Sequence, residues 1–213
     1  MENEFSLLSQ NIVLKSLDWA YEKAIYGVKG LDSAAELANN YLKGKGTLIE
    51  QVNSLIKWQN TKAGTSGFIT GLGGLLTMPV TLPTNITSVL YIQIRMVAAI
   101  AIMGGYDVKD DRVKTLVYSC VAANSTAEVA KTFGLKLGEK LMKEGIKRLS
   151  KETIIRINQA VGFRLLTKFG QKGVINMGKS VPFIGGIISA TFDIVSTNII
   201  GNIAREIFII NEV

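Results

Sequence analysis

The chain has 213 residues, of which 24 are Lys or Arg, 17 are Asp or Glu and one is Cys, and it contains no His. Charged residues make up 19% and hydrophobic residues 47%, which excludes a disordered or collagen-like chain. One Cys cannot form an intrachain disulfide, and the lack of His removes the serine–histidine triad, the histidine general base and most zinc sites. The N-terminal sequence MENEFSLLSQ has no basic signal region, so we expect a cytoplasmic protein.

The pattern is helical along nearly the whole chain, beginning with residues 1–62. Two S/T-x-x-E capping boxes, Ser33–Glu36 and Thr47–Glu50, predict helix starts, and the GKG at 44–46 predicts a break between the two helices. The second segment, 63–106, is the least polar, because no charged residue occurs in the 32 positions from Ala63 to Ile94.

Gly and Pro are too frequent in segment 63–106 for one straight helix. We predict a short helix at 66–77, a bend through MPVTLP, and a second helix from Thr84 to Met103 that ends at Gly104-Gly105. This segment is the first of two apolar helical hairpins that contain Gly and Pro.

Amphipathic and basic helices are predicted over 107–170. One helix is expected from Asp107 to Phe133, followed by a basic stretch and by a helix that Ser150 caps. Residues 171–210 are predicted to form the second apolar hairpin, in which the only charge between Ser180 and Ala204 is Asp193. The sequence therefore predicts an all-α, single-domain bundle of about eight helices with these two hairpins at its centre.

The apolar hairpins allow three interpretations: a buried core, re-entrant or membrane-embedded hairpins, and true membrane spans. A span needs about 20 apolar residues, and an ionised side chain near its centre costs about 2.5–3.5 kcal/mol. Since Arg95 and Asp193 interrupt the two candidate spans, we favour central helices that are apolar all round because neighbours surround them.

Arg95 and Asp193 are opposite in sign and lie in the middle of the two least polar helices. Burial of an unpaired ion is costly, so we predict that the two helices pack and that these side chains form a buried ion pair. Such a pair fixes helix register, or it forms, with Gln93 and Tyr91, a polar spot that receives a lipid head group or another ligand.

The net charge of +7 comes mainly from one stretch, Lys131–Lys151, which has seven basic and two acidic residues. It is either a solvated helix face or a surface attracted to an anionic membrane leaflet. Nucleic acid is not an expected partner, because the excess is modest and aromatic residues are absent among the basic ones. The predicted membrane-surface basic face consists of Lys136, Lys140, Lys143, Lys147 and Arg148.

Four long phrases resemble the EcsC proteins of bacteria: SLIKWQNTKAGTSGFITGLGGLLTMPVTLP, TSVLYIQIRMVAAIAIMGGYD, DDRVKTLVYSC, and INQAVGFRLLTKFGQKGV followed by VPFIGGIISATFD. They keep their order and cover the chain roughly from Asp18 to Phe208. The resemblance implies a helical protein and supplies no catalytic residues. Association with an ABC exporter belongs to the name-giving member and is implied here only by the family name.

These observations predict a membrane-associated, non-enzymatic accessory or interaction protein on the inner face of the cell membrane. No catalytic residue, metal site or cofactor is predicted, and a protein partner or a homo-oligomer is compatible with the sequence. Two alternatives stay open: an enzyme that modifies a lipid or another amphipathic substrate in a cleft near Arg95 and Asp193, and a soluble helical scaffold.

Overall fold

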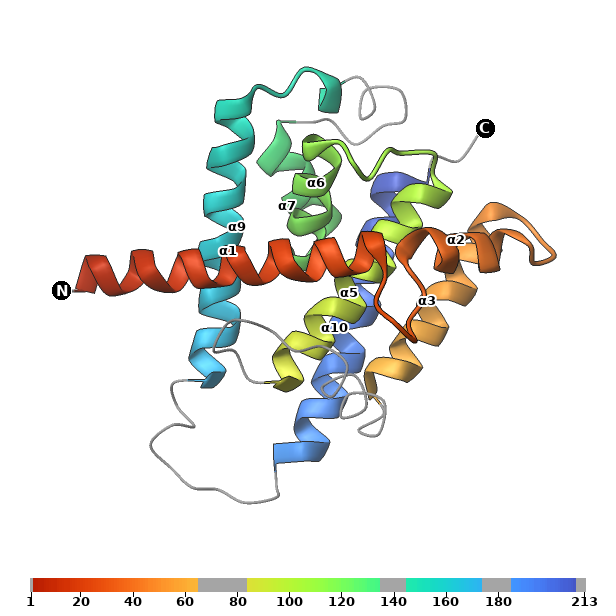
Figure 1. Ribbon diagram of the computed structural model, residues 1–213, viewed down its shortest axis with the longest axis horizontal. Helices are drawn as coiled ribbons and strands as arrows, with labels where there is room; N and C mark the ends of the chain where they lie inside the picture. The colour runs from red at the N-terminus through yellow and green to blue at the C-terminus, as the bar shows by residue number, and fades with distance from the viewer. Residues whose placement is uncertain (1, 65–83, 135–144, 174–184, 210–213) are drawn as a thin grey trace.

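In the computed structural model, the described residues are 2–64, 84–134, 145–173 and 185–209, and within them the chain is helical with no strand (Figure 1). Among these described residues, β-type pairing is limited to a single bridge between Val28 and Leu31. The assigned helices are α1 (Glu2–Tyr26), α2 (Ala34–Leu42), α3 (Leu48–Gly64), α5 (Thr84–Met103), α6 (Asp111–Ala122), α7 (Thr126–Phe133), α9 (Lys151–Gly173) and α10 (Gly185–Phe208). The predicted all-α bundle of about eight helices is confirmed.

Helix α5 lies at the centre and contacts α1, α2, α3, α6 and α10. Every side chain from Ser88 to Ala101 is buried, which explains why this helix is apolar on all sides. Across the described part of the chain, no helix combines the length and the apolar character needed to cross a bilayer. The predicted short helix at 66–77 and its bend lie outside the described residues.

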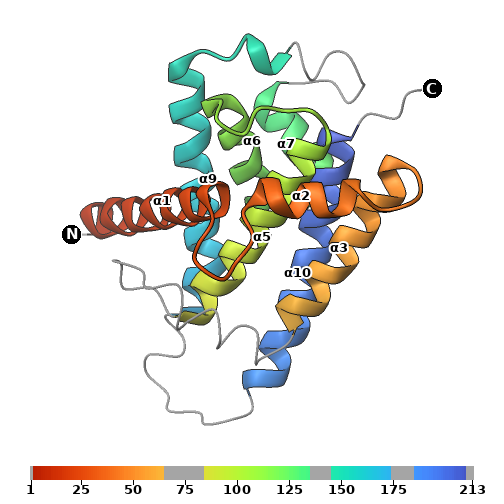
Figure 2. The same cartoon turned by 45° about the vertical axis from the view of Figure 1, so that its right-hand side comes forward.

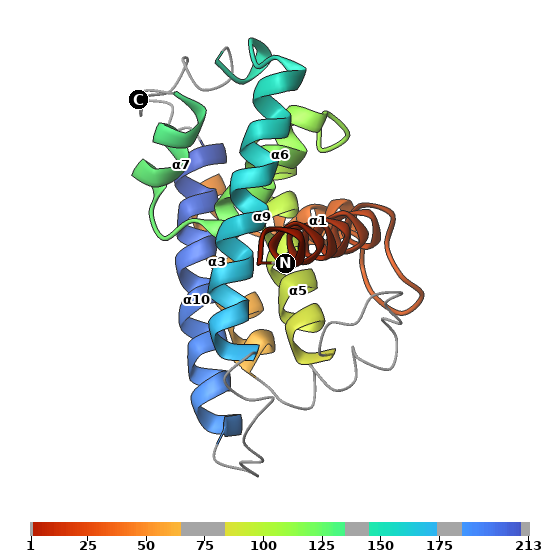
Figure 3. The ribbon, with the colours of Figure 1, turned by 90° about the vertical axis from the view of Figure 1, so that its left-hand side faces the viewer.

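Helix α1 lies across α5 and α9 and is seen nearly end-on in Figure 3. On the other side, α10 lies beside α3, as Figure 2 shows, and also contacts α5. The two helices approach closely at Gly201, where an added Cβ would lie 2.8 Å from Ile56 Cγ2. Unlike α5, helix α10 has an open side, on which Val195 is 51% and Ile199 41% exposed. The expectation that neighbours surround both apolar helices therefore holds for α5 and not for this face of α10.

Local sequence signals set several helix ends. Both predicted capping boxes are present, with the backbone N of Ser33 donating to Glu36 Oε2 at 2.7 Å and that of Thr47 donating to Glu50 Oε2 at 2.7 Å. The predicted end of α5 is confirmed, because Gly105 adopts a positive φ of 76° directly after the helix.

One predicted helix, Asp107–Phe133, is divided into α6 and α7. The break occurs because Ser125 is extended and its hydroxyl accepts a hydrogen bond from the backbone N of Glu128, which starts a new helix. The S-x-x-E spacing of Ser125 and Glu128 is the sequence signal for this break.

Candidate functional site

The predicted site residues on α5 face two different sides of that helix. Arg95 and Tyr91 are four residues apart and share one side, whereas Gln93 is two residues from Arg95, a rotation of about 200°. The Nε2 of Gln93 donates to Ser196 Oγ and to Thr197 Oγ1, both at 3.1 Å, and all three side chains are buried. Gln93 therefore forms a polar link to α10 and is separate from the surroundings of Arg95.

Arg95 points instead toward α2, α3 and the loop that precedes α2. Its Nη1 donates to the backbone oxygen of Asp32 at 3.1 Å, and its Nη2 donates to Gln59 Oε1 at 3.4 Å. The guanidinium also lies over the Tyr91 ring, 5.2 Å from its centroid, a cation–π contact. We call Arg95, Tyr91 and Gln59, with the Asp32 carbonyl, the Arg95 cluster.

The charge of Arg95 has no carboxylate partner among the described side chains. Arg95 is only 2% exposed, yet the ion pairs of the described residues join other groups. A carbonyl, an amide oxygen and a ring face offset only part of the cost of removing a guanidinium from water. The Arg95 cluster thus holds a buried positive charge in excess.

Three buried atoms of this cluster make no hydrogen bond of normal geometry in the described structure: Arg95 Nε, Gln59 Nε2 and Tyr91 Oη. Of these, Tyr91 Oη lies close enough to Arg95 for a side-chain contact that lowers the pKa of Tyr91. Gln59 and Tyr91 are both 0% exposed, so water at the surface does not satisfy them. Buried polar groups are nearly always bonded in folded proteins, so three such atoms in one cluster need an explanation.

Two further residues lie near this charge. Burial lowers the pKa of the Lys62 ammonium, and the neighbouring charge of Arg95 lowers it further. Burial raises the pKa of Tyr91 and of Tyr41, and in both cases the charge of Arg95 acts in the opposite direction. Lys62 also lies 5.9 Å from the centroid of the half-exposed Trp58 ring.

Gln59 was not among the predicted site residues, although its position on α3 carries a signal in the sequence. Gln59 falls on the same side of α3 as Val52, Leu55, Ile56 and Ala63, all of which are buried. A lone amide on an apolar helix face predicts a buried polar partner elsewhere in the fold.

Asp193 belongs to α10, but its side chain lies outside the described residues. The ion pair between Arg95 and Asp193 stays a prediction. The described contacts of Arg95 involve Asp32 and Gln59, whereas α10 meets α5 through Gln93.

A second polar cluster joins α1 to α6. Tyr118 Oη donates to Asp18 Oδ1 at 2.8 Å, and Lys114 Nζ lies 2.7 Å from the same oxygen. Tyr21 Oη donates to the Val108 carbonyl at 2.6 Å, and its ring meets that of Tyr118 edge to face at 5.6 Å. These four side chains, Asp18, Tyr21, Lys114 and Tyr118, form the Asp18 cluster.

The model of the EcsC protein family matches residues 12–210, nearly the whole chain. The chain belongs to the EcsC protein family. No curated protein and no solved structure matches it.

Part of the predicted basic face can be located in this EcsC family protein. Lys147 and Arg148 are exposed, as is Lys151 at the start of α9, whereas Lys136, Lys140 and Lys143 lie outside the described residues. Farther along α9, Ile155 is 56% and Phe163 52% exposed, although the opposite side of the helix is buried. A basic surface therefore continues into a helix face with exposed large apolar side chains.

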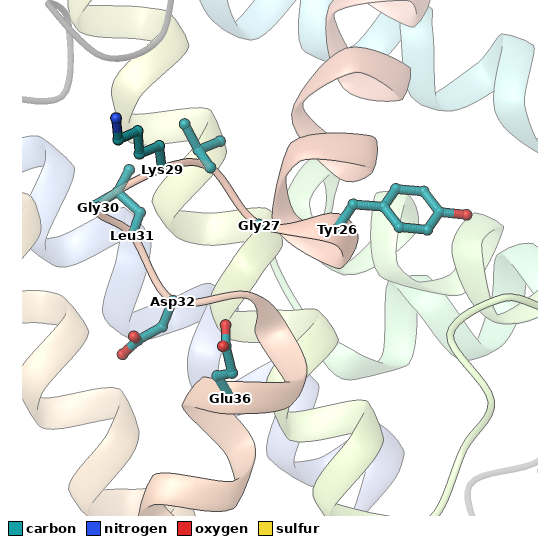
Figure 4. Close-up of a pocket in the computed structure, with 8 residues that line it drawn as sticks. Tyr26, Gly27, Lys29, Gly30, Leu31, Asp32 and Glu36 are labelled. Atoms are coloured by element: carbon teal, nitrogen blue, oxygen red, sulfur yellow. The ribbon is translucent and has the colours of Figure 1, made fainter.

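A shallow pocket of about 580 Å³ lies at the loop between α1 and α2 of the EcsC family protein, lined by Tyr26–Asp32 and Glu36 (Figure 4). The side chain of Tyr26 points away from those of Asp32 and Glu36. The pocket borders the Arg95 cluster through Asp32, whose carbonyl accepts from Arg95. Its lining offers no arrangement of nucleophile and base, so the pocket alone assigns no chemistry.

Proposed function

We propose that this EcsC family chain is a membrane-associated, non-enzymatic accessory protein that binds the anionic inner face of the cell membrane through its basic surface. The observation that carries the proposal is the exposed basic group Lys147, Arg148 and Lys151, followed on α9 by exposed Ile155 and Phe163. Peripheral membrane proteins combine these two features, basic residues for anionic lipid and apolar residues for the acyl boundary.

Helix geometry supports a common surface for the apolar residues. Ile155, Gln159 and Phe163 follow each other at intervals of four, so they lie along one exposed side of α9, with Arg156 beside them. Glu152 is exposed in the same region and reduces the local charge without reversing it.

Vesicle sedimentation tests the proposal. The chain is expected to bind vesicles containing phosphatidylglycerol and not vesicles of phosphatidylcholine, and added salt is expected to weaken binding. Each Lys or Arg near an anionic surface contributes about 1 kcal/mol, so Lys147→Ala/Arg148→Ala should weaken binding by roughly 30-fold.

Matched variants serve as controls. Lys43 and Lys45 are also exposed, so Lys43→Ala/Lys45→Ala removes the same charge elsewhere and should change binding by less than about threefold. Ile155→Ser/Phe163→Ser should weaken binding more than Leu42→Ser/Ile49→Ser, which alters two other exposed apolar residues. Equal losses of binding in Lys147→Ala/Arg148→Ala and in Lys43→Ala/Lys45→Ala would show that only net charge matters. No binding at low salt would favour the soluble scaffold.

A further inference from the structure

The unsatisfied donors of the Arg95 cluster indicate what kind of ligand it could bind. All three of its unpartnered buried atoms, Arg95 Nε, Gln59 Nε2 and Tyr91 Oη, carry a hydrogen that can be donated. Because Tyr91 Oη can also accept a hydrogen bond, the donors that most need an acceptor are Arg95 Nε and Gln59 Nε2, and the buried guanidinium favours an acceptor with negative charge.

A second cation near the Arg95 cluster also favours a negatively charged acceptor. Lys62 lies close enough to Arg95 for the two charges to repel, and this lowers the pKa of Lys62 beyond the effect of burial. The charge of Asp32 acts in the opposite direction and raises the pKa of Lys62, but this carboxylate is exposed and accepts from Asn40 at 3.4 Å, while the Asp32 backbone carbonyl meets Arg95. An anion between these groups would be attracted by two cations.

The donors are an amide, a phenol and a guanidinium on two helices. Gln59 belongs to α3, and Tyr91 and Arg95 belong to α5. Arg95 already uses one hydrogen of Nη1 for the Asp32 carbonyl and one of Nη2 for Gln59, so part of its donor set is occupied. Single donors from different directions suit a tetrahedral oxyanion, whose oxygens point several ways.

We propose that Arg95, Gln59 and Tyr91 form a binding site for a phosphate group, with Lys62 at its outer side. The phosphate belongs either to a small soluble molecule or to a lipid head group. The proposal is independent of membrane binding through α9, because it concerns other residues on other helices.

Titration calorimetry of the full chain with sodium phosphate, at constant ionic strength, tests the site directly. Saturable binding is expected for the unaltered chain and its loss for Arg95→Met. Tyr91→Phe and Gln59→Leu should each weaken binding about 5- to 20-fold, because each removes one donor.

The exposed Arg156 supplies a matched control, since Arg156→Met removes the same charge outside the cluster and should leave phosphate binding unchanged. Thermal unfolding of the same variants is measured with and without phosphate. The Arg156→Met control is essential in this experiment, because phosphate salts stabilise folded proteins in general. A rise in Tm with phosphate should be larger in the unaltered chain and in Arg156→Met than in Arg95→Met. If Arg95→Met does not fold, Gln59→Leu and Lys62→Met carry the comparison.

Further ligands identify the source of the phosphate. Binding of both glycerol phosphate and inorganic phosphate supports a soluble source, and binding of only short-chain phosphatidic acid below its micellar concentration supports a lipid source. Lys147→Ala/Arg148→Ala should bind phosphate normally, which separates this site from the membrane surface.

Three results would overturn the proposal: no binding of any of these phosphates, equal binding by Arg95→Met, or equal binding of acetate. A fourth result that would overturn it is evidence that the Asp193 carboxylate pairs with Arg95. If Asp193→Asn and Arg95→Met each lower stability and the double variant is no worse than either, Asp193 occupies the cluster.

Discussion

The Arg95 cluster and the Asp18 cluster contain similar side chains but differ in how their charges and hydroxyl groups are satisfied. In the Asp18 cluster, a carboxylate receives both a lysine and a tyrosine hydroxyl, and the second tyrosine donates to a carbonyl. In the Arg95 cluster, a more deeply buried cation has only neutral partners, and its tyrosine hydroxyl has none in the described structure. The first arrangement is typical of a link that holds two helices together, whereas the second leaves buried donors without an acceptor among the described residues.

The largest expected difference between the two clusters is in the loss of folding stability at alkaline pH. Burial raises the pKa of Tyr118, and the charge of Asp18 raises it further; burial likewise raises the pKa of Tyr21. The unfolded chain loses these protons near pH 10, whereas the folded chain retains them, so stability is complete below pH 10 and falls as pH rises above it. Each tyrosine should contribute a loss of roughly 2–3 kcal/mol by pH 12.

Urea denaturation at several pH values between 8 and 12 measures this loss. Tyr118→Phe should flatten the decline, because the removed phenol can no longer ionise in the unfolded chain. Tyr91→Phe should flatten it less, since the charge of Arg95 opposes the effect of burial at Tyr91. Identical pH profiles for the two variants would mean that the clusters do not differ electrostatically.

At neutral pH, loss of the Tyr118 hydroxyl should lower the free energy of unfolding by about 1 kcal/mol. The hydroxyl donates to a charged acceptor, but Asp18 is 55% exposed and water can replace part of the bond. Urea denaturation of Tyr118→Phe at pH 7 checks this value. An unchanged midpoint would show that Lys114 and water satisfy Asp18 alone.

The matching substitution in the other cluster should have the opposite sign. Tyr91→Phe removes a buried hydroxyl without a hydrogen-bond partner in the described structure, so without ligand the free energy of unfolding should rise by up to about 1 kcal/mol. The same denaturation experiment, in a buffer free of phosphate and sulfate, measures the change. A loss as large as that of Tyr118→Phe would indicate a partner for Tyr91 Oη and weaken the case for an open site.

The two clusters also show how far the sequence could lead. The capping boxes at Ser33 and Thr47 were predictable because each depends on residues three positions apart. The burial of α5 was predictable because its low charge leaves no solvated side. These features are local, and their physical causes can be read within one turn or one helix.

The partners of Arg95 were not predictable in the same way. One is the carbonyl of Asp32, a backbone group that every residue carries, and the other is Gln59, which is 36 positions away. The prediction named Asp193 because its charge is opposite to that of Arg95. Neutral groups such as a carbonyl or an amide were not considered as partners. The Lys114–Asp18 ion pair was not predicted either. Both side chains are partly exposed, and a charged residue at a solvated position does not indicate a specific partner.

Arg95→Met separates the remaining explanations for the excess charge. If no carboxylate of the chain depends on Arg95, the substitution removes a costly buried cation but leaves Gln59 Oε1 without its donor, and these opposing effects should keep the change in unfolding free energy within about 1 kcal/mol. If a buried carboxylate such as that of Asp193 depends on Arg95, the loss should reach about 3–5 kcal/mol, because an unpaired ion would stay buried. Urea denaturation without added phosphate distinguishes the two values, and Arg156→Met provides the baseline for loss of an exposed arginine. A loss of 3 kcal/mol or more would make the Arg95 cluster a closed structural link like the Asp18 cluster.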